Sequence, residues 1–225
     1  MESLDLLANN VANAATGGYK ADREFYSLYT APEAAGDAAQ TMPVIERPWV
    51  DHAQGTLHTT GNPLDLALSG KGFFAVNGPS GPLYTRNGNF RVAPDGKLVT
   101  GEGYAVRDPQ GAPLTVAGRL PVDVAADGTI TQDGNVIGKL EVVDFSNAAG
   151  LTKQGASYFR VNDPSLKPAP ATATVEQGSL ESSNTGSAES AVRLVGVMRQ
   201  FEMLQRAVSL GAEMNRKAVE EVAKV

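Results

Sequence analysis

The chain contains no cysteine among its 225 residues, so disulfide bonds, thiolate zinc sites and cysteine nucleophiles are excluded. Aromatic residues make up 6% of the sequence, and no apolar run approaches the roughly 18 residues that a membrane-spanning helix needs. A basic segment followed by an apolar one, the pattern of a cleaved signal peptide, is also missing. We therefore expect no membrane insertion, and either a cytoplasmic protein or one exported without a cleaved signal peptide.

Clusters of basic residues are missing as well. Lys and Arg number 19 against 25 Asp and Glu, which gives a net charge of -6. Proteins that bind nucleic acid neutralise phosphates with clustered Lys and Arg. Nucleic acid is therefore not an expected partner.

Glycine and proline are frequent, at 24 and 13 residues, and many of them separate short apolar segments. Asp-Gly pairs that begin at residues 95, 127 and 133 predict turns, and Asn87-Gly88 predicts a two-residue β-hairpin. Closely spaced strands with local turns are typical of antiparallel folds. The middle of the chain is therefore predicted to form an antiparallel β-sandwich or a small barrel.

Both ends of the chain have helical periodicity instead. Leu4, Leu7 and Val11 form an apolar stripe on a short helix that ends before Gly17-Gly18. A second helix, without internal proline and about 54 Å long, is predicted from Ser187 onward. Its apolar stripe consists of Ala191, Leu194, Met198, Phe201, Leu204, Val208, Ala212, Val219 and Val222. Because a small domain cannot bury a helix of that length, we predict that the terminal helices pair in a coiled-coil-like bundle.

Asn9, Asn10 and Asn13 lie towards the end of the N-terminal helix and permit two interpretations. Asparagine weakens a helix and favours its end, which accounts well for Asn13. Buried amides can instead fix the register between helices, as a single Asn does in coiled coils. The sequence leaves both interpretations open.

Together these patterns predict an α+β protein that is mainly β, with helices flanking the β-rich middle. Such a chain, with apolar helical ends, favours an assembling protein over an enzyme. The predicted organisation has an N-terminal helix and arm (1–29), an extended or mobile connection (30–53), a β-rich domain (54–165), a return linker (166–186) and a C-terminal helix (187–225) that pairs with residues 1–16. Residues 21–28 are expected to continue the first helix or to run as an arm.

Residues suited to catalysis are sparse, and we predict no catalytic residue, cofactor or metal. His52 and His58 are the only histidines, lie in a polar segment near prolines, and are predicted to be solvated; no G-x-S-x-G motif accompanies them. The glycine-rich string at 70–72 precedes residues that cannot open a phosphate-binding helix, so we assign it to a turn. The alternative from another class is a secreted β-sandwich carbohydrate-active enzyme with Asp65 and Glu141 as its carboxylate pair.

Several stretches resemble the flagellar axial proteins, the rod and hook subunits of bacteria. Residues 4–20 resemble their N-terminal signature, and residues 177–184 resemble the segment that leads into their C-terminal helix. Between these lie the strings QGTL at 54–57, TGNPLDLA at 60–67, GKGFF at 70–74, YTRNGNF at 84–90 and DGKLVT at 95–100. The similarity covers nearly the whole chain, in the expected order.

Within this family the proximal rod subunits are the most similar, since SYFRV at 157–161 and MRQFEM at 198–203 look like their versions of these regions. Distal rod and hook subunits are the alternatives. Family members usually have further helical residues before the position of Leu4. We therefore expect either a start codon assigned too late or a truncated N-terminus.

The resemblance implies a mechanical function. Terminal helices of neighbouring subunits would form the inner tube of the flagellar rod, with the β-rich domain outside it, and the rod would transmit torque. The implied partners are other rod and hook subunits, further copies of the chain, and the flagellar type III export apparatus. The implied location is the periplasmic rod of the basal body, reached without a cleaved signal peptide. A monomeric binding module is a further alternative, which the long apolar helix disfavours.

The predicted assembly interface belongs to the two terminal helices. It includes the asparagines because of the register interpretation given above. Its residues are Leu4, Leu7, Asn9, Asn10, Val11, Asn13, Leu194, Met198, Phe201, Leu204, Val208, Val219 and Val222.

Overall fold

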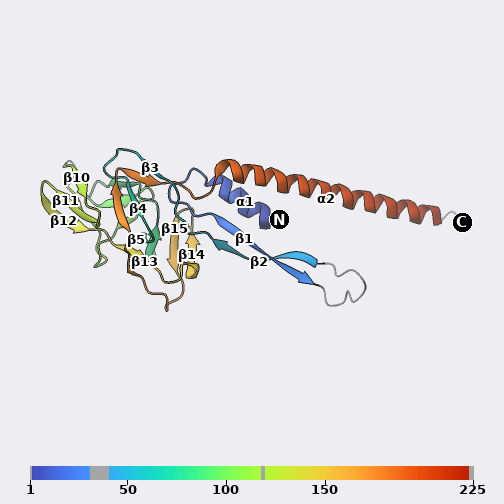
Figure 1. Cartoon of the computed structure of the whole chain (residues 1–225), viewed down its shortest axis with the longest axis horizontal. Coiled ribbons are helices and arrows are strands. Elements are labelled where there is room, and N and C mark those ends of the chain that lie inside the picture. The colour runs from blue at the N-terminus through green and yellow to red at the C-terminus, as the bar shows by residue number, and fades with distance from the viewer. Residues whose placement is uncertain (1, 31–40, 118–119, 223–225) are drawn as a thin grey trace.

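The computed structural model describes residues 2–30, 41–117 and 120–222. A β-rich body, made of strands β3 to β18, lies at one end, and a helical arm extends from it (Figure 1). The arm contains the short helix α1 (Glu2–Ala12), the long helix α2 (Ser187–Val222) and the antiparallel strands β1 (Asp22–Thr30) and β2 (Thr41–Val50). The predicted class, mainly β with a helix towards each end, is confirmed.

The body is built from short strands, as the frequent turn residues predicted. Their bounds are β3 (Leu57–Thr59), β4 (Leu66–Ser69), β5 (Phe73–Gly78), β6 (Gly81–Thr85), β7 (Phe90–Val92), β8 (Leu98–Thr100), β9 (Ala105–Val106), β10 (Val122–Val124), β11 (Thr129–Gln132), β12 (Asn135–Lys139), β13 (Val142–Asp144), β14 (Leu151–Gln154), β15 (Tyr158–Val161), β16 (Ala169–Pro170), β17 (Thr174–Gln177) and β18 (Ser179–Glu181). A short 3-10 helix, Ala148–Gly150, precedes β14.

The largest sheet has nine strands and follows the order β14-β15-β6-β5-β9-β8-β7, with β13 on β5 and β16 on β13. Strands β10-β11-β12 form a second sheet, while β17 pairs with β4 and β18 with β3. Across the described residues no sheet closes on itself, because β14 and β7 end the large sheet without pairing to each other. The barrel-like part of the prediction is therefore wrong, and the sandwich stays a prediction.

Two hydrophobic clusters fill the body. Phe74, with Leu66 and Leu68, belongs to the larger cluster, whereas Phe73 belongs to the smaller one with Phe159. Successive residues of a strand point to opposite faces. Strand β5 therefore lies between the two clusters and is buried on both sides, which accounts for its continuous apolar run.

The predicted Asp-Gly turns are confirmed. They join β7 to β8, β10 to β11 and β11 to β12, and in each case the two strands pair with each other. Asp and Gly suit these positions because they accept the backbone conformations that tight turns need.

The hairpin predicted at Asn87-Gly88 is wrong, because β6 pairs with β5 and β15 and not with β7. Gly88 passes closely over β4 instead. Its carbonyl accepts a hydrogen bond from the Leu66 amide at 3.0 Å. A Cβ atom at Gly88 would lie 1.7 Å from the Leu66 carbonyl oxygen, so the glycine serves a close backbone contact.

Three segments that were expected to be an arm, a connection and a linker contain strands in the structure. Residues 21–28 contribute to β1, whose aromatic-rich sequence favours extended backbone. The expected connection 30–53 includes β2, and its residues 31–40 lie outside the described residues. The expected linker 166–186 includes β16, β17 and β18, and Val175 of β17 is buried in the larger cluster. The returning chain thus completes the body before α2 begins.

Helix α2 extends away from the body, and α1 lies beside its first turns (Figure 1). Helix α2 begins at Ser187, where the long helix was expected to start, and it contacts α1. A coiled-coil-like bundle stays a prediction, since α1 has 11 residues and α2 has 36. No helix in the described part of the chain is long and apolar enough to cross a membrane.

Candidate assembly site

Helix α2 exposes most of its predicted apolar stripe. Met198, Phe201, Leu204 and Val208 are 51%, 38%, 64% and 72% exposed, and Leu194 is half-buried. The side chains of the last two predicted members, Val219 and Val222, lie outside the described part of the structure. Single exposed apolar residues are ordinary, whereas a contiguous apolar stripe marks an interaction site.

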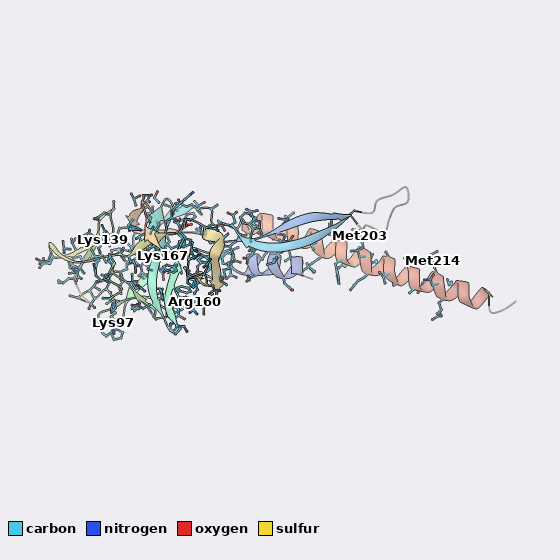
Figure 2. All side chains as sticks on the ribbon, turned by 90° about the horizontal axis from the view of Figure 1, so that it is seen from below. Lys97, Lys139, Arg160, Lys167, Met203 and Met214 are labelled. Carbon is cyan, nitrogen blue, oxygen red and sulfur yellow. The ribbon has the colours of Figure 1, made fainter. Side chains whose placement is uncertain are left out.

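A second apolar face, which the sequence analysis missed, lies on the opposite side of α2. Val192, Met203, Leu210 and Met214 are 75%, 62%, 58% and 67% exposed. Met203 lies about three helical turns after Val192, Leu210 about two turns after Met203, and Met214 about one turn after Leu210, so all four share one face. Figure 2 shows Met203 and Met214 on the part of α2 that lies beyond the body. The spacing of these residues was visible in the sequence. It was missed because only one partner helix was expected, and the first stripe was enough to contact it.

Helix α1 is held in place by Asn10, which is 5% exposed. The Asn10 Nδ2 donates to the Asp22 carbonyl at 2.7 Å, and its Oδ1 accepts from the Asp22 amide at 2.9 Å and the Tyr19 hydroxyl at 3.0 Å. Leu7 is buried beside it, while Leu4 and Val11 are half-buried. Asn10 therefore fixes α1 to the beginning of β1 in the same subunit.

Asn13 lies directly after the end of α1. Its amide and its Nδ2 both donate to the Asn9 carbonyl, at 3.1 and 2.9 Å, and its Oδ1 accepts from the Thr16 hydroxyl. Asn9 donates to the Asp22 carboxylate at 3.3 Å. Asn13 fits the first interpretation, because it lies where the helix ends. Asn10 is buried but binds β1 and Tyr19, not another helix, so a role in the register between helices stays a prediction.

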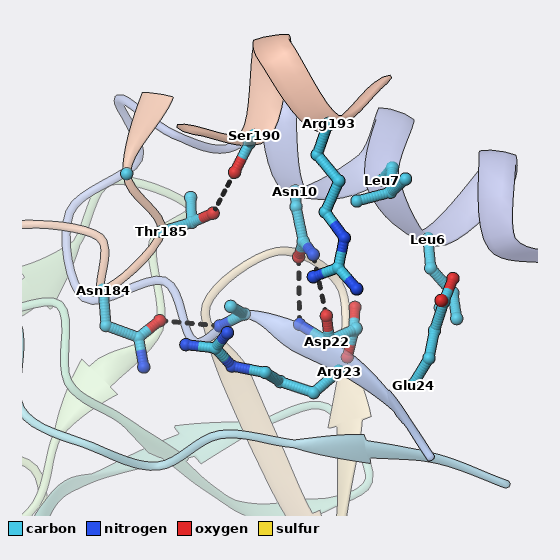
Figure 3. Close-up of a pocket in the computed structure, with 12 residues that line it drawn as sticks. Leu6, Leu7, Asn10, Asp22, Arg23, Glu24, Asn184, Thr185, Ser190 and Arg193 are labelled. Carbon is cyan, nitrogen blue, oxygen red and sulfur yellow. Dashed lines mark hydrogen bonds between the residues drawn. The ribbon is translucent and has the colours of Figure 1, made fainter. Parts of the chain in front are cut away.

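A small cavity of about 60 Å³ lies between α1, β1 and the first turns of α2 (Figure 3). Leu7 of α1, residues 22–24 of β1 and Arg193 of α2 line it. The hydroxyls of Thr185 and Ser190 share a hydrogen bond of 2.9 Å that joins the preceding loop to α2. A cavity of this size holds only a few water molecules and is too small for an organic ligand. It is therefore a gap in the packing between α1, β1 and α2.

The chain passes between arm and body at residues 51–55 and 182–186, which we call the neck. A buried ion cluster joins these two connections. The Glu181 carboxylate accepts from Lys20 Nζ at 2.5 Å through one oxygen and from Arg86 Nη1 at 3.1 Å through the other. The side chains of Lys20 and Glu181 are 0% exposed, and that of Arg86 is 4% exposed.

Backbone groups of the neck complete the cluster. The Gly55 amide donates to Glu181 Oε1 at 2.9 Å, and Lys20 Nζ donates to the Ala53 carbonyl at 2.6 Å. Burial lowers the pKa of Lys20 and of Arg86, and the Glu181 charge opposes both shifts. Charges removed from water need such close partners, since an unpaired buried charge is strongly unfavourable.

These three residues were not among the candidates expected from the sequence. Lys20 ends the first family-like string, Arg86 lies in YTRNGNF, and Glu181 lies in the string that precedes the C-terminal helix. Lys20 is the only basic residue of the first string, and Arg86 and Glu181 are the only charged residues of theirs, which was the available signal.

His52 is not a solvated surface residue, in contrast to the prediction. Its ring centroid lies 5.0 Å from that of Phe159 and 5.7 Å from that of Phe73. Burial, with a smaller contribution from the Lys20 charge, lowers the pKa of His52 to about 4. The polar flanks predicted exposure, but the neck turns the ring onto the aromatic cluster. His58 is exposed, as predicted.

Asp65 and Glu141, the carboxylates of the enzyme alternative, hold the body together. Asp65 is 4% exposed and accepts hydrogen bonds from the side chains of Thr60 and two asparagines. Glu141 pairs with Arg107 at 2.8 Å and lines a cavity of about 660 Å³ that Asp65 does not line. The two carboxylates therefore do not face a common cleft, and the carbohydrate-active alternative is not favoured.

Two family models match the chain. The Flagellar hook protein FlgE/F/G D1 domain matches residues 67–138, and the Flagellar basal body rod FlgEFG protein C-terminal region matches residues 176–221. The flagellar basal-body rod protein FlgF of Caulobacter vibrioides is 34% identical, over 99% of this chain and 92% of its own length. FlgF of Mesorhizobium japonicum is 32% identical over 88% of this chain and 83% of its own length. FlgG of Agrobacterium fabrum is 32% identical over 94% of this chain and 90% of its own length.

These matches include both the body and the arm. The first matched range contains β5 to β11, and the second contains β18, with Glu181, and all but the last residue of α2. The apolar faces and part of the neck therefore lie in regions that the relatives share. This chain belongs to the family of flagellar basal-body rod proteins.

Proposed function

We propose that this chain is a structural subunit of the flagellar basal-body rod, of the proximal rod type, and not an enzyme. The observation that carries the proposal is α2, a 36-residue helix with exposed apolar side chains on two faces. Its relatives named flagellar basal-body rod proteins FlgF and FlgG support the same conclusion.

Contacts between subunits would bury the two faces of α2. Full burial of a Leu or Phe side chain contributes about 1.5–3 kcal/mol relative to exposure. Several such residues on each face therefore provide a strong driving force for association. The proposed interface consists of the first stripe with the half-buried Leu4 and Val11 of α1, and of the second face through Met203 and Leu210.

This architecture suits a drive shaft. The arm would contribute its helices to the wall of the rod, while the body, at the other end of the molecule, would lie outside that wall (Figure 1). Torque would then pass through packed helices. Other rod and hook subunits would be the neighbours, in the periplasm. Export through the flagellar type III apparatus, without a cleaved signal peptide, belongs to the same proposal and is supported by the resemblance to axial proteins.

Phe201→Glu and Leu204→Glu should each block rod assembly, because each places an unpaired charge on a surface that must lose its water. With either variant as the sole copy in the cell, we expect lost motility and purified basal bodies without complete rods. The circular dichroism of aromatic groups in the body should be unchanged, since α2 lies apart from it.

Gln200→Glu is the matched control, since it adds the same charge at an exposed neighbouring position between the two apolar faces. It should leave motility near the parental level. Complete rods from Phe201→Glu cells, or an equal defect in Gln200→Glu cells, would contradict the proposal.

A further inference from the structure

We propose that Glu181 fixes the direction of the helical arm relative to the body. It is the last residue of β18, immediately before the second neck connection. Its carboxylate also accepts from the amide of Gly55 in the first connection. One side chain thus binds both places where the chain passes between arm and body.

The two cations on Glu181 come from opposite sides of the neck. Lys20 lies between α1 and β1 and therefore belongs to the arm, whereas Arg86 directly follows β6 of the body. Arg86 is in turn anchored to the body, because its Nη2 donates to the Gly70 carbonyl at 2.5 Å. Glu181 bridges a cation of the arm to a cation of the body.

The backbones around the cluster approach one another closely. A Cβ atom on Gly18 would lie 2.3 Å from the Asn87 amide nitrogen, and one on Gly55 would lie 2.1 Å from the Ser182 carbonyl oxygen. The Gly18 amide also donates to the Glu181 carbonyl at 2.7 Å. A turn of the arm about the neck must separate these contacts and the ion pairs together.

Two hydrogen bonds of the uncharged Asn184 side chain lie beside the ion cluster. The Asn184 Oδ1 accepts from the Ala21 amide at 2.7 Å, and its Nδ2 donates to the Asp51 carbonyl at 2.7 Å (Figure 3 shows the first of these bonds). Asn184 positions the two neck connections but joins only segments near the arm. Two charged links reach the body: the Lys20–Glu181–Arg86 cluster, and the Lys153–Asp22 pair at 2.8 Å between β14 and β1. Of these, only the cluster also binds the neck backbone, through the Gly55 amide and the Ala53 carbonyl.

A buried ion cluster suits an orienting role better than an apolar contact would. Buried ions that are separated lose both partner and solvent, so a displacement of the arm that pulls the cluster apart is strongly unfavourable. The arm and body should therefore move as one unit. That this unit sets the position of the body on a rod rests on the proposed function, but the orienting role itself concerns the single subunit.

Distance measurements on the purified full chain test the orienting role. The chain has no cysteine, so Ala8→Cys on α1 and Val136→Cys on β12, both exposed, provide two spin-label sites, one on each part. Pulsed dipolar spectroscopy then reports the distribution of distances between arm and body. We expect one narrow distribution in the parent, and one at least twice as broad after Glu181→Gln, which keeps the side chain's shape but removes its charge.

Glu141→Gln is the matched control. It breaks the Arg107–Glu141 pair, which lies in the body away from the neck, and should leave the distribution unchanged. A Glu181→Gln distribution as narrow as the parent's would overturn the proposal, as would equal broadening by Glu141→Gln. Neither result depends on rod assembly, which the Phe201→Glu experiment tests separately.

Lys20→Met provides a second test should Glu181→Gln unfold the body, because it removes the arm's cation and leaves the Glu181–Arg86 pair in place. Broadening with a folded body supports the orienting role. A narrow distribution in Lys20→Met contradicts it, and so does unfolding of the body in both variants, since the cluster would then serve the body's own stability.

Discussion

His52 makes the stability of the protein depend on pH at the scale of a single residue. Its pKa falls from the ordinary 6.5 to about 4 on folding, because burial disfavours the charged ring. The unfolded chain therefore binds the proton more readily than the folded one between these values. The contribution is fully present above pH 6.5 and is lost as pH falls through 4, by about 2 kcal/mol after allowance for the partial exposure of the ring.

Denaturant titrations at pH 7 and pH 4.5 measure this loss. His52→Leu should lose less stability over that interval than the parent, since leucine preserves an apolar contact with Phe73 and Phe159 and has no proton to bind. His58→Leu, at an exposed position, should behave like the parent. Identical losses in all three proteins would show that His52 does not contribute.

The charged residues that pair beside the neck could not be predicted from the sequence. The family-like strings contained Lys20, Arg86 and Glu181, but their pairing joins residues as far apart as 20 and 181. Nothing local in the sequence specifies such a contact. His52 was misassigned for the same reason, since its flanking residues are polar and its aromatic neighbours are distant in the chain.

At the scale of elements, most local signals were accurate, with the Asn87-Gly88 pair as an exception. The Asp-Gly turns depend on neighbouring residues, and the sequence predicted them. The long helix was likewise expected from Ser187, the residue at which α2 begins. Pairings between distant segments were not accessible. Gly88 looked like a hairpin residue, although it serves contact with β4, and the segment containing β17 looked like a linker because of its Pro, Ala and Thr content.

Because β17 and β18 belong to the body, we place the C-terminal boundary of an independently folding body at residue 186, and not at residue 165 as expected from the sequence. Strand β17 pairs with β4, and Val175 packs in the same cluster as Leu66 and Leu68. A fragment of residues 54–186 should therefore unfold cooperatively on heating. A fragment of residues 54–161 should melt at a lower temperature or without a cooperative transition, because β4 loses its partner strand.

Differential scanning calorimetry of the two fragments, beside the full chain, distinguishes these outcomes. A shorter fragment as stable as the longer one would show that β17 and β18 are dispensable for folding. A longer fragment without a cooperative transition would show that the body depends on the arm.

At the scale of the whole molecule, the body completes its own core while the arm leaves two apolar faces of α2 uncovered. The sequence predicted the division into a β-rich middle and apolar helical ends, because periodicity changes where the strands give way to α2. It did not predict that α2 is apolar on opposite sides, a property that calls for neighbours on both. The uncovered apolar faces of α2 thus favour assembly, and the neck connects this helix to the body.

Site-specific photo-crosslinking in assembled basal bodies tests the central claim most directly. Benzoylphenylalanine would replace Phe201 on the first face of α2, or Met203 on the second, in otherwise parental protein. On irradiation of purified basal bodies, both positions should form adducts with rod subunits or with a second copy of the chain. Basal bodies that contain the protein but give adducts at neither position would contradict assembly through α2.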